Sequence, residues 1–336
     1  MDFNLPKTYR TKTIEGVSIP GIIKNGTYFF VDLEVYEDGR VACWNFRDFE
    51  HFKKDIKRGW VSVGIPDGKK ISIHSLGNWT ISESSWLHSK KSFVDYVWSI
   101  IKHLNPNLEN LYTYSEKKVN GVTIGENGRG TIYKEEKIAP NEPFPKKIKG
   151  ARVNLFFKNK NNEYHLVRLD IYTQNSIVIN RLAKPFDIDL TQLEQMISDG
   201  EILTELPIGA EVQILGLGKF KIYEEQYSSN ISEKLLEIKD MIRVLNGEPS
   251  IIELCREIYE EYINNPTETL KQKLKEAYES IPEHERMYVG DMDVKDTAVR
   301  MIIYGKREIE NWSHYQVAKK MGKKLPTINI PNSKKE

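Results

Sequence analysis

Acidic and histidine side chains are concentrated in one short stretch near the C-terminal end of this 336-residue chain. Carboxylate oxygens are the ligands that Mg²⁺ and Mn²⁺ prefer, and a bound divalent ion can activate a water molecule for hydrolysis. One hypothesis is therefore a metal-dependent hydrolase or nuclease that uses Mg or Mn. Its candidate catalytic residues are Glu283, His284, Asp291, Asp293, Asp296 and His314.

The same stretch also has a purely structural interpretation. Asp291 or Asp293 can cap a helix that continues through Val299 and Ile302, and the helix dipole favours acidic residues in a first turn. The stretch contains no Glu-x-Lys pair of the nuclease type, no His-Glu-x-x-His motif and no complete calcium-binding loop. We therefore favour helix capping and surface charge over a metal site, and the leading prediction includes no metal and no cofactor.

Two further patterns have alternatives that involve nucleotides or DNA. The glycine-rich run at residues 121–130 lacks the Gly-Lys-Ser/Thr ending and the following helix of a phosphate-binding loop, so it predicts hairpin turns. Residues 311–322 have the character of the first helix of a helix-turn-helix motif. Pro326 and Pro331, however, interrupt the segment where a recognition helix would have to follow. Neither pattern favours nucleic-acid binding.

The overall composition is typical of a soluble intracellular protein. The chain has 49 Lys and Arg residues against 48 Asp and Glu residues, and a net charge of +1 supplies no general attraction for a phosphate backbone. Its two cysteines, Cys43 and Cys255, are too few for a disulfide framework or a multi-cysteine zinc site. The N-terminus has no apolar signal region, and no apolar stretch is long enough to span a bilayer. We therefore predict a cytoplasmic protein with no membrane association.

Two segments of the chain repeat one another at a constant separation, 141 residues from Gly59 to Gly200. They carry glycine, proline and apolar residues at matching places, and the agreement continues through a closing helix predicted over residues 92–103. Upstream the separation falls to 136, as from Tyr28 to Tyr164, which predicts a five-residue insertion near Pro185 in the second copy. We interpret the chain as an internal duplication.

Each copy is predicted to contain strands, a helix, further strands and a closing helix. Alternation at Val31, Leu33 and Val35 is typical of a half-buried strand, and the helical spacing of residues 46–57 ends at Gly59. The predicted fold class is α+β: an internally duplicated module, with an antiparallel sheet and two helices per copy, followed by a small all-α C-terminal domain. The predicted domains are a first α+β module (12–106), a hairpin-bearing connector (107–150), a second α+β module (151–247), an α-helical domain (248–322) and a mobile tail (323–336).

Positions that differ in kind between the two copies indicate side chains that the fold does not need in its core. Trp60 corresponds to Glu201, and Trp98 corresponds to Lys239. Because a position that accepts a charge in one copy is expected to face solvent in both, Trp60 and Trp98 are predicted to be exposed anchors of a protein interface. His74 would share the face of Trp60 if neighbouring strands keep simple alternation. Trp60, His74 and Trp98 are the predicted binding residues, and the alternative is that both tryptophans are buried within the chain itself.

The leading functional prediction is a non-catalytic intracellular protein-binding or adaptor protein. Duplicated small modules without an assembled active-site motif are a common way to build an extended interaction surface. One concrete form is an immunity-like or defence-associated adaptor of a bacterium or phage, an origin that only the abundance of Lys, Ile and Asn indicates. The expected partner is another protein, whereas its identity and the oligomeric state of the chain do not follow from the pattern.

Overall fold

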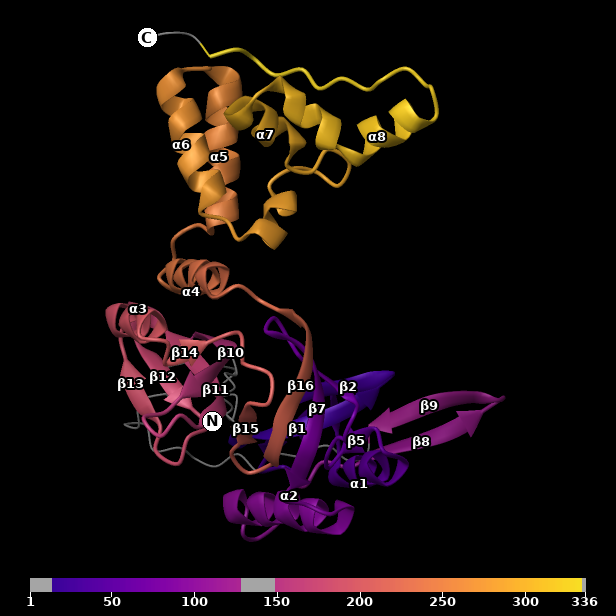
Figure 1. The fold of residues 1–336 in the computed structure, drawn as a ribbon. Helices are drawn as coiled ribbons and strands as arrows, with labels where there is room; N and C mark the ends of the chain where they lie inside the picture. The colour runs from indigo at the N-terminus through magenta and orange to yellow at the C-terminus, as the bar shows by residue number, and fades with distance from the viewer. Residues whose placement is uncertain (1–13, 128–148, 334–336) are drawn as a thin grey trace, which may run out of the picture.

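The computed structural model describes residues 14–127 and 149–333, which form one large sheet with flanking helices and a separate helical domain (Figure 1). Within these residues the large sheet has 14 strands, and its first half comes from residues 16–104. The elements of this half are β1 (Gly16–Asn25), β2 (Thr27–Tyr36), β3 (Val41–Cys43), β4 (Asn45–Arg47), α1 (Phe49–Arg58), β5 (Val61–Ser62), β6 (Lys70–Ile73), β7 (Gly77–Trp86) and α2 (Lys90–Leu104).

The second half of the sheet has the same order of strands and helices. Corresponding helices begin with similar caps: the Asp48 carboxylate accepts a backbone N–H bond at the start of α1, and Asp189 does so at the start of α3. The elements of this half are β10 (Gly150–Lys158), β11 (Tyr164–Tyr172), a 3₁₀ turn (Thr173–Asn175), β12 (Ile177–Asn180), β13 (Phe186–Ile188), α3 (Leu190–Ser198), β14 (Ile202–Leu203), β15 (Glu211–Ile214), β16 (Gly218–Ser228) and α4 (Ile231–Leu245).

The two halves join at β7 and β16, and corresponding strands lie on either side of this pair. β7 and β16 pair antiparallel with Ile81 opposite Ile222. The strand order continues through β6 and β2 on one side and through β15 and β11 on the other. Gly77 and Gly218 are required here because a Cβ atom on either would lie 2.4 Å from a carbonyl oxygen of the opposite strand. The sheet therefore has a nearly two-fold arrangement about the β7–β16 pair.

The sheet is mixed and continuous, whereas the sequence pattern predicted an antiparallel sheet in each copy. β2 pairs parallel with β6, with Tyr28 opposite Ile71, and β11 pairs parallel with β15, with Tyr164 opposite Val212. A parallel pair needs a long crossover, which residues 37–69 supply in the first half. Alternation of apolar residues indicates that a segment is a strand but not which strand it pairs with. The parallel pairs could therefore not be predicted from the alternation.

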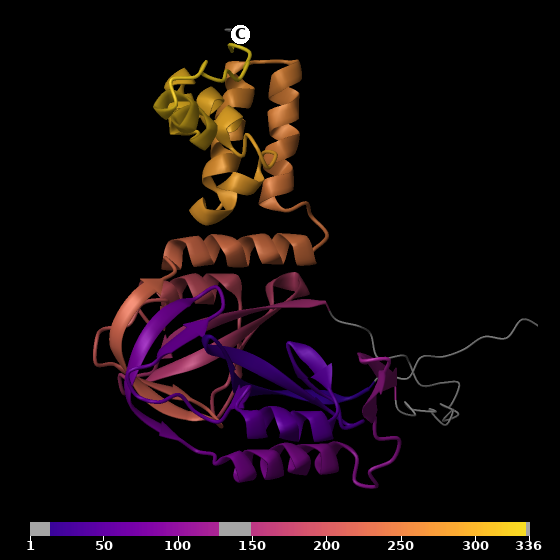
Figure 2. The same ribbon diagram turned by 90° about the vertical axis from the view of Figure 1, so that its right-hand side faces the viewer.

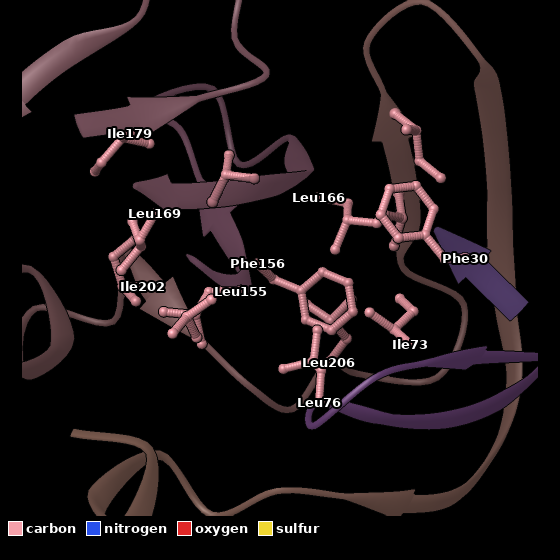
Figure 3. Close-up of a cluster of buried hydrophobic side chains, with 14 of the residues drawn as sticks. Phe30, Ile73, Leu76, Leu155, Phe156, Leu166, Leu169, Ile179, Ile202 and Leu206 are labelled. Atoms are coloured by element: carbon pink, nitrogen blue, oxygen red, sulfur yellow. The ribbon is translucent and has the colours of Figure 1, made fainter. Parts of the chain in front are cut away.

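The largest hydrophobic core combines side chains from both halves of the sheet. Phe30, Ile73 and Leu76 from the first half lie beside Phe156 from the second (Figure 3). The Trp79 ring meets that of Phe156 edge-on, with centroids 5.3 Å apart. A second core lies beneath α1 and α2 and contains first-half residues only. Because the larger core is shared, each half depends on the other for the burial of its apolar surface.

Charged side chains also connect the two halves. Arg152 on β10 pairs with Glu34 on β2 at 2.7 Å, and the Arg181 guanidinium pairs with Asp32 on β2. The Tyr36 hydroxyl donates a 2.6 Å hydrogen bond to Glu34. This bond, with the pairing to Arg152, lowers the pKa of the Glu34 carboxyl. The ionised form of Glu34 is therefore the form that the folded chain favours.

The C-terminal region is helical, and α4 lies between it and the sheet (Figures 1 and 2). Its core includes Cys255, Leu274 and Tyr278. A reciprocal pair of hydrogen bonds between Ser250 and Glu253 caps its first helix. Its elements are α5 (Ile251–Asn264), α6 (Glu268–Glu279), a 3₁₀ turn (Glu283–Tyr288), α7 (Thr297–Tyr304), a second 3₁₀ turn (Lys306–Asn311) and α8 (Ser313–Lys320).

The segment after α8 lies against this helical domain as far as residue 333, where a mobile tail was predicted. Ile330 packs on the domain core, and the Ser333 hydroxyl donates to the Glu268 carboxylate at 2.8 Å. The absence of helix or strand in the sequence pattern did not reveal these tertiary contacts. Residues 334–336 lie outside the described part of the chain.

The predicted hairpin of the connector is formed by β8 (Tyr114–Val119) and β9 (Val122–Asn127), which pair antiparallel. The rest of the glycine-rich run falls in residues 128–148, which, like residues 1–13, lie outside the described part of the chain. Across the described ranges, no helix combines the length and the apolar character that crossing a bilayer requires.

Candidate binding surface

The structure places both predicted anchor tryptophans partly inside the first half, which corrects the expectation that they are exposed. Trp60 and Trp98 are half-buried and pack against the core beneath α1 and α2. The Trp98 ring lies on Phe49, with centroids 4.6 Å apart. At the corresponding position of the second half, Lys239 instead makes a 2.7 Å ion pair with Glu194. The charge of Lys239 therefore did not indicate that Trp98 is exposed. The two halves therefore pack differently at this position.

An exposed tryptophan that the comparison of the copies did not single out lies beside Trp60. Trp44 is the single residue between β3 and β4, and 57% of its surface is exposed. Its ring centroid is 5.5 Å from that of Phe29 and 6.2 Å from that of Trp60, which it meets edge-on. Phe29, Trp44 and Trp60 form a group of adjoining rings that we call the aromatic surface.

The backbone at Trp44 is unusual for so large a side chain. Its φ angle of 68° lies in the left-handed region, which costs a bulky L-residue roughly 1–3 kcal/mol. More than half of the Trp44 surface stays in water, so packing on Phe29 and Trp60 covers only part of the ring. A strained, solvent-facing tryptophan is more typical of a functional position than of a folding requirement.

The sequence did contain a signal for Trp44. The separation between the two copies changes on either side of it, from 136 at Cys43 and Ile179 to 141 at Asn45 and Phe186. The structure accordingly joins β3 to β4 through one residue, and β12 to β13 through residues 181–185. A residue at such a break has no counterpart, so the comparison of paired positions passed over it.

Positive charge lies at the rim of the aromatic surface. The Arg58 guanidinium lies 6.0 Å from the centroid of the Trp60 ring, and the arginine side chain is 59% exposed. Its partner Asp55, at 2.7 Å, is buried. A partner that contacts these rings would therefore meet the cationic side chain of Arg58 at their edge.

His74 does not join Trp60, contrary to the expectation of a shared face. It is exposed in the turn that follows β6. The strand order β6, β2, β1, β5 places two strands between this turn and Trp60 at the start of β5. β6 pairs with β2 and not with a strand beside β5, so His74 and Trp60 lie apart along the sheet. The structure therefore does not bring the three predicted binding residues together.

The aspartates of the predicted metal site have local structural roles. The Asp291 carboxylate accepts backbone N–H bonds from Asp293 and Val294, at 2.9 and 2.6 Å. The Asp296 carboxylate accepts the Tyr278 hydroxyl bond, and burial together with this bond raises the pKa of Tyr278. These contacts are those of a capped turn and a buried hydrogen bond.

The remaining residues of that site face other parts of the molecule. His284 lies 3.5 Å from carboxylate oxygens of Glu233 and Glu237 on α4, and the Glu283 N–H donates to Glu233 at 3.2 Å. The His314 ring instead stacks on a neighbouring indole. In residues 14–127 and 149–333, no group of three His, Cys, Asp or Glu side chains could hold a metal ion. The geometry therefore does not assemble the metal site of the hydrolase hypothesis.

Two family models match this chain, each over a different part. A family model described as a domain of unknown function (DUF7638) matches residues 4–108 and 138–249. A second model, also described as a domain of unknown function (DUF7639), matches residues 250–328. The first match covers both halves of the sheet, and the second covers the helical domain. Neither a curated protein nor a solved structure matches the chain.

Proposed function

We propose that this chain, which belongs to the DUF7638 family, is a non-catalytic protein-binding or adaptor protein. In this proposal the aromatic surface of Phe29, Trp44 and Trp60 contacts an acidic segment of a partner protein. The observation that carries the proposal is Trp44, which is 57% exposed and held at a φ of 68°. Glycine or asparagine would adopt this backbone conformation at a lower cost than tryptophan.

The chemistry of the surface indicates the kind of partner. Tryptophan and arginine are enriched among the residues that contribute most to protein interfaces. Arg58 at the rim favours a partner with acidic side chains, because complementary charge speeds encounter and sets orientation. Apolar side chains of the same partner segment would cover the rings of Trp44 and Trp60.

The substitution Trp44→Asn tests the proposal. Asparagine tolerates the left-handed backbone, so we expect the free energy of unfolding to stay the same or to rise by up to about 1 kcal/mol. Binding should weaken by about 2 kcal/mol or more, which is roughly thirtyfold. The measurement is calorimetric titration with the partner recovered by affinity capture from the native cell, beside urea denaturation of the two proteins.

A matched control is Tyr223→Ser. Tyr223 lies on β16, is 65% exposed and is not part of the aromatic surface, so its loss should leave binding unchanged. Arg58→Gln should weaken binding more at low salt than at high salt, because screening removes the attraction at the rim. Equal binding by Trp44→Asn and the wild type would refute the proposal, and so would a large loss of stability in Trp44→Asn.

We also propose that the two halves descend from one duplicated module. The support is the agreement of their pairing: Ile23 opposite Val61 corresponds to Phe157 opposite Ile202, in the same antiparallel sense. Such a duplication would present two related surfaces, one on each side of the β7–β16 pair. An experimental structure in which residues 16–104 failed to superpose on residues 150–245, strand for strand, would contradict it.

A further inference from the structure

A cavity of about 370 Å³ lies in the second half of the sheet. Its walls come from the end of β7, from β11, from the connection between β12 and β13, and from the turn between β15 and β16. This volume falls within the range of small-molecule sites. Its lining includes the side chains of Leu87, His165, Arg181, Leu182, Leu215 and Lys219.

The cavity arises where the two halves differ in one connection. In the first half Trp44 alone joins β3 to β4, and its indole packs on Phe29 at 5.5 Å. In the second half His165 takes the place of Phe29, since Phe29 lies opposite Ser72 and His165 opposite Gln213. Residues 181–185 form the longer connection there. The space that an indole occupies in one half is therefore bounded by a loop in the other.

One part of the lining is apolar and partly uncovered. Leu87 is 65% exposed and Leu215 is 50% exposed, although both border the cavity. Leu182 adds a half-buried apolar side chain from the loop. Leucines gathered at the mouth of a cavity are typical of sites that accept the apolar part of a ligand.

The ionisable part of the lining consists of basic side chains. The Arg181 guanidinium is buried and already pairs with Asp32, so it forms a fixed part of the cavity wall whose charge is already compensated. Lys219 is half exposed and pairs with the exposed Glu211 at 3.0 Å, a kind of surface pair that contributes little stability. Its ammonium group can therefore turn toward a ligand. Burial lowers the pKa of His165, which leaves a neutral imidazole as a hydrogen-bonding group.

We propose that this cavity binds a small carboxylate with an apolar body. Leu87, Leu182 and Leu215 contact the hydrocarbon part of the ligand, and Lys219 pairs with its carboxylate. Among the residues that the structure describes, no carboxylate side chain lines the cavity. The ligand carboxylate would replace Glu211 as the partner of the Lys219 ammonium. This binding site is separate from the aromatic surface, and the proposal does not rest on the function proposed for that surface.

The test is calorimetric titration of the full chain with hexanoate, 1-hexanol and hexylamine at pH 7. These probes share one hydrocarbon chain and differ in charge. We expect hexanoate to saturate one site, hexanol to bind at least fivefold more weakly and hexylamine to bind more weakly still. Lys219→Gln should weaken hexanoate binding at least fivefold and leave hexanol binding unchanged, and a thermal melt checks that the variant is folded.

Two further variants complete the design. Leu215→Asp places a carboxylate on the exposed turn at the cavity mouth, so it should abolish hexanoate binding with little change in the melt. Lys69→Gln removes an exposed lysine in the first half and should leave hexanoate binding as in the wild type. Three results would overturn the proposal: no saturable binding of hexanoate, equal binding of hexanoate and hexanol, or an equal loss in Lys69→Gln and Lys219→Gln.

Discussion

Removal of the buried lysine on α4 is expected to destabilise the protein more than removal of the lysine together with its partner. Lys234 is 1% exposed, and its ammonium donates to the Glu237 carboxylate and, at 3.0 Å, to the Ser75 hydroxyl. Lys234→Met would leave the Glu237 carboxylate buried without this cation. The loss of one member of a buried pair costs about 3–5 kcal/mol.

The structure places the expected cost at the lower end of that range. The imidazole of His284 lies 3.5 Å from Glu237, and this half-exposed ring can take over part of the pairing. We therefore expect Lys234→Met to lower the free energy of unfolding by about 3 kcal/mol. The double variant Lys234→Met, Glu237→Leu buries no charge and keeps a similar volume, so it should come within about 1 kcal/mol of the wild type. The first half already holds an apolar pair, Phe93 and Tyr96, at the corresponding positions of α2.

The measurement is urea denaturation of the wild type, the two single variants and the double variant at pH 7. The quantity of interest is the coupling between the two sites, for which we expect about 2–3 kcal/mol with an unchanged dependence on urea. Lys91→Met with Asp95→Leu is the matched control, because that ion pair on α2 is exposed and should show a coupling of at most about 0.5 kcal/mol. A double variant as unstable as Lys234→Met would refute the reasoning, since the buried charge would then not be the source of the cost.

Three further predictions test the packing and the electrostatics of the sheet. Trp60→Glu and Trp98→Lys should each lower the free energy of unfolding by about 1–3 kcal/mol, because each puts a charge where a half-buried ring packs. An unchanged thermal melt in both variants would show that the two rings do not contribute to the core. Cys43 and Cys255 should react with a thiol reagent at pH 8 only after unfolding, since burial raises their pKa values to about 11 and about 12; rapid labelling of the folded protein would contradict this. Glu34→Gln should reduce stability at pH 7 but not near pH 3, because the lowered pKa of this carboxyl contributes stability above its unfolded value that is lost as the pH falls through the folded value; an equal effect at both pH values in urea denaturation would argue against it.

Local chemistry determined where many of the elements begin and end. Gly59 ends α1 in a left-handed conformation with φ of 81°, a stop that any reading of the sequence can locate. Asn25 and Gly26 are a hairpin signal of the same local kind, and the structure has β1 and β2 on either side of this turn, although no strand was predicted over β1. Signals of this kind lie within a few residues of one another, so they are visible without the fold.

Tertiary structure alone decided which strands meet and which side chains are covered. The pairing of β7 with β16 joins residues more than 130 positions apart, and neither strand carries a mark of its partner. The aromatic surface depends on the same kind of contact, since Phe29, Trp44 and Trp60 come from separate segments. Their exposure depends on what packs around them, which the type of a residue does not specify. The sequence by itself therefore determined the local turns, helix ends and repeated pattern, whereas the mixed sheet and both candidate sites required the packing of distant segments.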